Sequence, residues 1–218
     1  MSQIFRPGAN TVARAVLAGA LLSVPLAFLL GFALVRSPYA TGVGIAPPQP
    51  VPFSHQHHVG ELGLDCRYCH TSVETSSAAG MPATYTCMTC HSQLWTNAAM
   101  LAPVRESLAR HEPLAWQRVY DLPDFVYFDH GIHIAQGIGC SECHGRVDTL
   151  ALTRKLKAQP MHWCLDCHRN PAQNIRPRDE VFNMAWQHPA NQLELGRRLV
   201  DAYGVQTSQL TDCSICHR

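Results

Sequence analysis

Charged side chains are scarce in this sequence. Only 15% of the 218 residues are Asp, Glu, Lys or Arg, and the formal net charge at pH 7 is +1. A nucleic-acid-binding protein usually carries a basic patch or stripe, and the sequence has no such run of charge. The composition therefore excludes nucleic acid as a partner, while the length allows one or two domains.

The alternation of apolar and polar residues that marks a half-buried strand is also missing. Two stretches have helical character instead, 92–111 and the amphipathic segment 191–203. Pro103 suits a helix start or a kink, and Gly204 suits a helix C-terminus. The rest is rich in proline, glycine and turns, so we predict a mainly α fold with much irregular coil.

No cysteine lies outside one repeated motif. The ten cysteines form five C-x-x-C pairs, and each pair is followed directly by histidine. A disulfide framework gives no reason for that histidine. Structural zinc sites use four ligands, and five pairs cannot all be matched two by two. C-x-x-C-H is the attachment signature of c-type haem.

We therefore predict five covalently bound haem c groups. Their thioether bonds would form at Cys66, Cys69, Cys87, Cys90, Cys140, Cys143, Cys164, Cys167, Cys213 and Cys216. The histidine after each pair lies under the ring and becomes the proximal iron ligand. These ligands would be His70, His91, His144, His168 and His217.

Four of the five motifs belong to an internal repeat. In each copy a phenylalanine precedes two histidines at i and i+3, and two C-x-x-C-H motifs follow. The copies are residues 53–91 and 128–168, and the spacing between the second histidine and the first cysteine is one residue shorter in the second copy. The sequence thus predicts two equivalent two-haem units, with a fifth haem at 213–217.

The remaining histidines outnumber the five irons. Residues at i and i+3 on a helix are neighbours on one face, so each histidine pair can serve two adjacent haems. We predict distal ligands at His55, His58, His130 and His133, with the pairing of each to an iron left open. For the fifth haem the candidates are Met161, Met184 and His188. A methionine there would raise that haem's potential.

The number of possible iron ligands bears on whether the protein is an enzyme or an electron carrier. A haem enzyme needs an open iron position for its substrate, whereas here every iron can be six-coordinate. The ligand count therefore favours an electron carrier. We expect His57 and His111, which are not needed as ligands, to be exposed.

One long uncharged run is present, at residues 15–35. As a helix it would span about 30 Å, the thickness of the bilayer core. A cleaved signal peptide is the alternative, but its apolar region is typically only about 7–15 residues long and ends at an A-x-A-like site. We predict a retained anchor at 15–36.

The anchor defines the other parts of the chain. Residues 1–14 would be a cytoplasmic N-terminus, 37–52 a Pro/Gly linker, and 53–218 the haem domain. Haem c is attached outside the bacterial cytoplasmic membrane, so we expect a single-pass inner-membrane protein with its haem domain in the periplasm. That domain has little room for an aliphatic core, so we expect the porphyrins to form its core.

The F-x-H-x-x-H arrangement before C-x-x-C-H resembles the small class III multihaem cytochromes c. Four longer segments are similar to the pentahaem cytochrome c subunits of bacterial alternative complex III: PFSH (52–55), DCRYCHTSVE (65–74), WQRVYDLPDF (116–125) and WCLDCHRNP (163–171). This resemblance covers roughly residues 50–218. It implies an electron-transfer subunit with no substrate site of its own.

In that family the complex oxidises membrane quinol and passes electrons to a periplasmic cytochrome c or a terminal oxidase. Iron–sulfur and polytopic membrane subunits are separate chains and would be the partners here. Three alternatives remain open from the residues alone. They are an anchored quinol dehydrogenase feeding a periplasmic reductase, a haem reductase for a small oxyanion, and a structural or sensory membrane protein.

Overall fold

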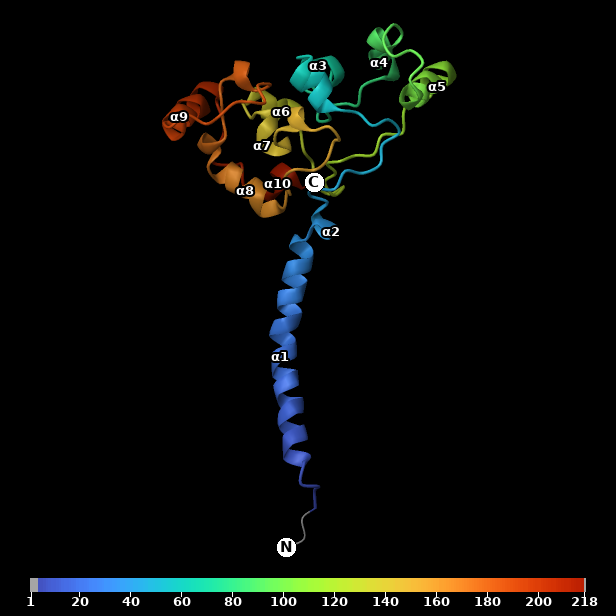
Figure 1. The fold of residues 1–218 in the computed structure, drawn as a ribbon. Helices are drawn as coiled ribbons and strands as arrows, with labels where there is room; N and C mark the ends of the chain where they lie inside the picture. Colours follow the sequence, from blue (N-terminus) through green and yellow to red (C-terminus); the bar gives the residue numbers. More distant parts are fainter. Residues whose placement is uncertain (1–3, 218) are drawn as a thin grey trace. The chain divides into compact units, whose positions relative to one another are not determined.

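The computed structural model describes residues 4–217, and the described chain divides after Val43 into two units. Residues 1–3 of the predicted N-terminal segment and residue 218 of the predicted haem domain lie outside the described residues. Figure 1 follows the chain from the N-terminal helix to the C-terminal haem-attachment motif.

The first unit is dominated by one apolar helix, α1, which spans Ala9–Arg36 and has no buried residue. At about 1.5 Å per residue its 28 residues extend roughly 42 Å. It is long and apolar enough to cross a membrane. The helix begins six residues before the predicted anchor, so Arg14 lies within it. An arginine near a helix end can extend its head to the lipid–water interface.

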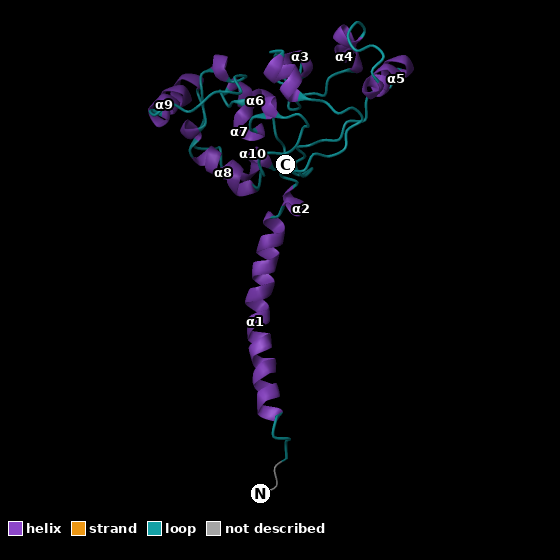
Figure 2. Cartoon of the chain, in the orientation of Figure 1, coloured by secondary structure: helices purple, strands orange, loops and turns teal. Residues whose placement is uncertain are grey.

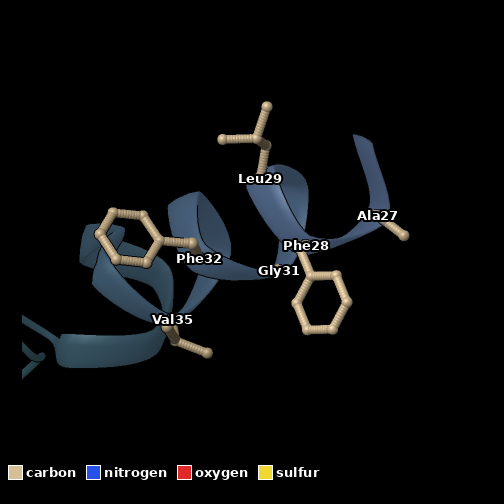
Figure 3. Close-up of a pocket in the computed structure, with 6 residues that line it drawn as sticks. All are labelled: Ala27, Phe28, Leu29, Gly31, Phe32 and Val35. Atoms are coloured by element: carbon tan, nitrogen blue, oxygen red, sulfur yellow. The ribbon is translucent and has the colours of Figure 1, made fainter. Parts of the chain in front are cut away.

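A depression near the C-terminal end of α1 is lined by apolar residues. Ala27 and Gly31 form a shallow depression beside the rings of Phe28 and Phe32, as Figure 3 shows. The side chains that line it offer no polar group to a soluble ligand. Such a surface suits contact with acyl chains.

Short helices joined by irregular coil make up the second unit (Figure 2). The α-helices are α3 (Cys66–Cys69), α4 (Thr84–His91), α5 (Ala102–Arg110), α6 (His130–Ala135), α7 (Cys140–His144), α8 (Met161–Arg169), α9 (Gln192–Tyr203) and α10 (Cys213–Cys216). Residues 4–217 contain no extended strand, and an isolated bridge pairs Ile138 with Ile175. The mainly α prediction is therefore confirmed.

The predicted linker, 37–52, is not extended along its whole length. Its first part forms a short helix, α2 (Pro38–Thr41), which ends at Gly42 in the left-handed conformation. Residues from Gly44 onward belong to the second unit. There the side chain of Gln49 makes two hydrogen bonds with the backbone of Gln117, at 2.9 and 3.0 Å. Val51 is buried against Leu101 and Val104.

The helix start predicted from Pro103 and the helix end predicted from Gly204 are both confirmed. Pro103 lies in the first turn of α5, and Gly204 caps α9 with a φ of +67°. The packing partner of α9 is the 3-10 turn η4 (Pro171–Gln173). A Cβ added at Gly196 would overlap the carbonyl oxygen of Ala172, so glycine permits this close backbone approach.

The aliphatic core of the protein is small. Nine hydrophobic residues are buried in the described chain: Val51, Val73, Leu101, Val104, Leu150, Ala172, Ile175, Val181 and Met184. A domain of this size normally buries far more of its surface on folding. The short helices therefore need a further apolar component to pack against, and large porphyrins are suited to that role.

Candidate haem-binding sites

Each C-x-x-C-H motif lies on a helix. We call them the first to fifth motifs: 66–70 on α3, 87–91 at the end of α4, 140–144 on α7, 164–168 on α8, and 213–217 on α10. Helical residues at i and i+3 lie on one side of a helix. Each pair of thiols is therefore directed to the same side, as attachment to one porphyrin requires.

Backbone carbonyls orient most of the proximal histidines. His70 Nδ1 lies 2.7 Å from the Gly80 carbonyl oxygen, and His168 Nδ1 lies 2.7 Å from that of Leu210. His91 and His217 make the same contact with Leu94 and Phe125, at 3.2 and 3.1 Å. A carbonyl only accepts, so Nδ1–H must donate, and Nε2 is free for iron. Metal-binding histidines are typically oriented in this way.

The two histidine pairs have the same geometry in both copies of the repeat. Phe53 stacks on His58 at a ring-centroid distance of 4.5 Å and meets His55 edge-on at 5.0 Å. The corresponding distances from Phe128 are 4.4 Å to His133 and 4.8 Å to His130. The phenylalanine therefore fixes both imidazoles of its pair, which explains its place in the repeat.

Hydrogen bonds hold the distal imidazoles as well. His58 Nδ1 lies 2.9 Å from the Ser54 carbonyl oxygen, and His133 Nδ1 lies 2.7 Å from that of Asp129. His130 Nδ1 lies 2.8 Å from the Ser77 carbonyl oxygen. Their Nε2 atoms are again left for a metal. His55 Nδ1 contacts the Thr153 hydroxyl at 2.9 Å.

The one-residue difference between the copies is taken up by a wider helical turn. The second copy forms an ordinary α-helix, α6, whereas the first forms a π-helix, η1 (Gln56–Glu61). Single π turns are how helices accommodate an extra residue, and they are frequent at functional sites. Both turns close on the carbonyl of the second histidine, through Leu64 N to His58 O at 3.0 Å and Ile138 N to His133 O at 2.9 Å.

Distal and proximal histidines face one another in pairs. The ring centroids are 6.2 Å apart for His58 and His91, 6.3 Å for His130 and His144, and 6.1 Å for His133 and His168. Imidazole nitrogens bind metals at about 2 Å, so a metal between two imidazoles places the ring centroids roughly 6 Å apart. The residues present thus fit a bis-histidine haem iron.

His55 lies close enough to His70 for their charges to interact. Burial, and then repulsion from the nearby His70 and His58, lowers the pKa of His55 to about 4. Burial also lowers the pKa of His144 to about 4 and depresses that of His133. These imidazoles are neutral at physiological pH, which is the form that binds iron.

The three candidates for the fifth distal ligand lie in different places. Met184 is buried beside a cavity of about 320 Å³ that Cys66 also lines. His188 Nε2 contacts the Glu142 carboxylate, within the third motif, at 2.9 Å. Met161 is 62% exposed and begins α8, one turn before Cys164. Met161 and Cys164 are both on α8. Cys164 lies close enough to Cys216, in the fifth motif, for the two sulfur atoms to interact. Of the three candidates, Met161 is therefore the one on the helix next to the fifth motif.

Two residues that support the third motif were not singled out from the sequence. Arg176 is 1% exposed and forms an ion pair with Glu142. Tyr120 meets the ring of His144 edge-on at 4.5 Å. Of the two, only Tyr120 could have been noticed in the sequence, because it lies in the segment 116–125 that resembles the pentahaem subunits. The contacts of Arg176 join residues far apart in the chain.

The histidines predicted to be exposed have ordinary surface roles. His57 Nδ1 lies 2.9 Å from the Glu61 carboxylate at the surface, and His111 is the left-handed C-cap of α5, with a φ of +56°. Across residues 4–217 no group of three or more His, Cys, Asp or Glu side chains converges as a metal site. Histidines of these residues instead face one another in twos.

Comparison with known proteins agrees with this geometry. Residues 126–218 match the family described as cytochrome c7 and related cytochrome c. A curated relative from Nitratidesulfovibrio vulgaris (Hildenborough), named "Menaquinone reductase, multiheme cytochrome c subunit", is 29% identical over 170 residues, covering 78% of this chain and 67% of the relative. The chain is therefore similar to multihaem cytochromes c, and its C-x-x-C-H motifs suit covalent attachment of haem c.

Proposed function

We propose that this chain is the membrane-anchored electron-conducting subunit of a quinone-linked respiratory complex, with five covalent haem c groups and no substrate site of its own. The facing histidine pairs carry this proposal. Three of them have ring-centroid distances of 6.1–6.3 Å. Two imidazoles at that distance would together hold a haem iron, which would then have no free position for a substrate.

The role of the polypeptide follows from its contacts. The bound haem supplies one-electron chemistry at iron. The chain favours the neutral imidazole at His55, His133 and His144 by burial. Carbonyl bonds at Nδ1 of most of the other proposed ligands would leave Nε2 for the iron, and the fold sets the order of the attachment motifs. Ligand identity and burial are the means by which proteins adjust haem potentials.

We further propose the distal ligands. His55, His58, His130 and His133 would serve the first, second, third and fourth haems respectively. Met161 would serve the fifth, because Met184 and His188 lie beside the first and third motifs. A histidine–methionine centre at the fifth haem would have the highest potential of the five.

In this proposal α1 is a membrane anchor and the haem domain is periplasmic. The iron–sulfur and polytopic membrane subunits of the complex are on other chains. Protease digestion of intact spheroplasts tests the topology, because an exposed haem domain should be degraded while cytoplasmic marker proteins survive. Protection of the haem domain would contradict it.

Two directions of electron flow are candidates. The resemblance to alternative complex III implies quinol oxidation toward a periplasmic cytochrome c or terminal oxidase. The name of the relative instead indicates menaquinone reduction. Purified complex supplied with a quinol analogue and oxidised cytochrome c, and separately with reduced cytochrome c and menaquinone, decides between them. We expect quinol-dependent cytochrome c reduction; turnover only in the opposite assay would favour the second direction.

An anchored quinol dehydrogenase is distinguished in the same experiment. If this chain alone oxidises quinol, the proposed absence of a substrate site is wrong. If turnover requires the copurified subunits, the electron-transfer role is supported.

A further inference from the structure

On the basis of the proposed function, we infer that the five attachment motifs lie in single file in an order that differs from their order along the chain. The order is second, first, third, fourth, fifth. The first motif is then internal, although it comes first in the sequence, and the second and fifth motifs are the two ends.

Neighbours within each copy of the repeat follow from shared elements. His130 and His133 lie on the same helix, α6, and face the third and fourth motifs respectively. In the first copy, the Tyr68 hydroxyl lies 2.6 Å from the Thr89 hydroxyl. These two residues are the inner positions of the first and second motifs, so those motifs are in direct contact.

The link between the two copies passes through the first motif. The carbonyl of Gly80 binds proximal His70 at 2.7 Å, and the carbonyl of Ser77 binds distal His130 at 2.8 Å. Carbonyls only three residues apart thus orient the proximal ligand of the first motif and the distal ligand of the third. The backbone amide of Gly131 adds a bond to the Ser76 carbonyl at 3.1 Å.

The cysteines agree with this link. Cys66 and Cys140 lie close enough for their sulfur atoms to interact. These are the leading cysteines of the first and third motifs. The histidines whose charges reach His144 are likewise its partner His130 and the first-motif pair, His70 and His55.

At the other end, the fifth motif adjoins the fourth. His168 is held by the carbonyl of Leu210, three residues before Cys213. The backbone amide of Tyr127 also donates to the Cys216 carbonyl at 2.8 Å, which connects the fifth motif to the segment just before Phe128.

Exposure identifies the same two ends independently. Of the ten cysteines, Cys90 and Cys213 are exposed and the other eight are half-buried. They belong to the second and fifth motifs. Large exposed aromatic side chains lie near both, with Tyr85 and Trp95 beside the second motif at 71% and 67%, and Phe125 beside the fifth at 64%. Redox partners would therefore meet this chain at these two motifs.

A cryo-EM map of the haem-loaded complex tests the order directly. We expect the iron at the second motif to have the iron at the first as its nearest neighbour, and the first to lie between the second and the third. If the second motif instead lies between the first and the third, the order is wrong while the proposed function stands. Fewer than five irons on this chain would contradict the proposed function itself.

A pair of matched variants gives a second readout in the full chain. His58→Met and His55→Met each raise the potential of one haem, so that it can be reduced alone. NMR of the remaining ferric haems then reports which ones sense the reduction. We expect shifted resonances from one haem for His58→Met and from two for His55→Met. The reverse pattern would overturn the order.

Discussion

His130→Ala should convert one haem from six-coordinate to five-coordinate iron. The alanine side chain cannot reach a metal held by His144, whose ring lies 6.3 Å from that of His130. A five-coordinate ferric haem is high-spin, so about one fifth of the haem should change spin state if five are bound. Loss of the Nδ1 bond to Ser77 costs only about 1 kcal/mol, so the fold should survive.

Electron paramagnetic resonance of the oxidised full-length protein measures this change. His57→Ala is the matched control, because His57 is exposed, lies beside Glu61, and touches the proposed ligand His58 only at a ring edge, with a centroid distance of 5.4 Å. It should leave all haems low-spin. Combining His130→Ala with Cys140→Ala and Cys143→Ala should abolish the high-spin signal, since that haem is then lost. An unchanged spectrum for His130→Ala, or a high-spin signal from His57→Ala, would refute the pairing.

Three further predictions concern stability. Arg176→Met leaves the carboxylate of Glu142 without its buried partner and should lower the free energy of unfolding by about 3–5 kcal/mol. Adding Glu142→Gln should recover part of the lost stability. An unchanged midpoint of urea unfolding would contradict the role of this ion pair. Gly196→Val forces a side chain against the carbonyl of Ala172 and should cost about 1–3 kcal/mol, as thermal unfolding would measure; no loss would argue against this packing. Burial holds the pKa of His144 at about 4, below its ordinary 6.5, so the unfolded chain takes up the proton first as pH falls. Stability should be complete above pH 6.5 and decline between pH 6.5 and 4, by up to about 3 kcal/mol from this group, and pH-independent unfolding over that range would contradict it.

Local pattern was sufficient to predict the attachment motifs, the repeat and the long apolar helix. Each depends on residues close together in the chain, such as the cysteines and histidine of a motif or Gly204 after α9. The equivalence of the two histidine pairs also followed from pattern, because Phe53 and Phe128 repeat with them. Their matching ring distances show why a phenylalanine was needed there.

Long-range contacts account for what the sequence could not predict. The spacing difference between the copies was visible, but not that a π turn would absorb it. The pairing of distal to proximal histidines depends on how α6 lies against residues 76–80. The burial of Arg176 depends on its meeting Glu142, 34 residues away. Each of these features depends on tertiary packing, which the periodicity of the sequence does not reveal.

A redox-poised spectroscopic titration of the purified complex tests the central claim most directly. It counts the haems on this chain, their spin states and their response to quinol. We predict five haems, all low-spin, each taking up one electron, with one histidine–methionine centre at the highest potential. A predominantly high-spin spectrum, or haems that do not respond to the quinone pool, would contradict it.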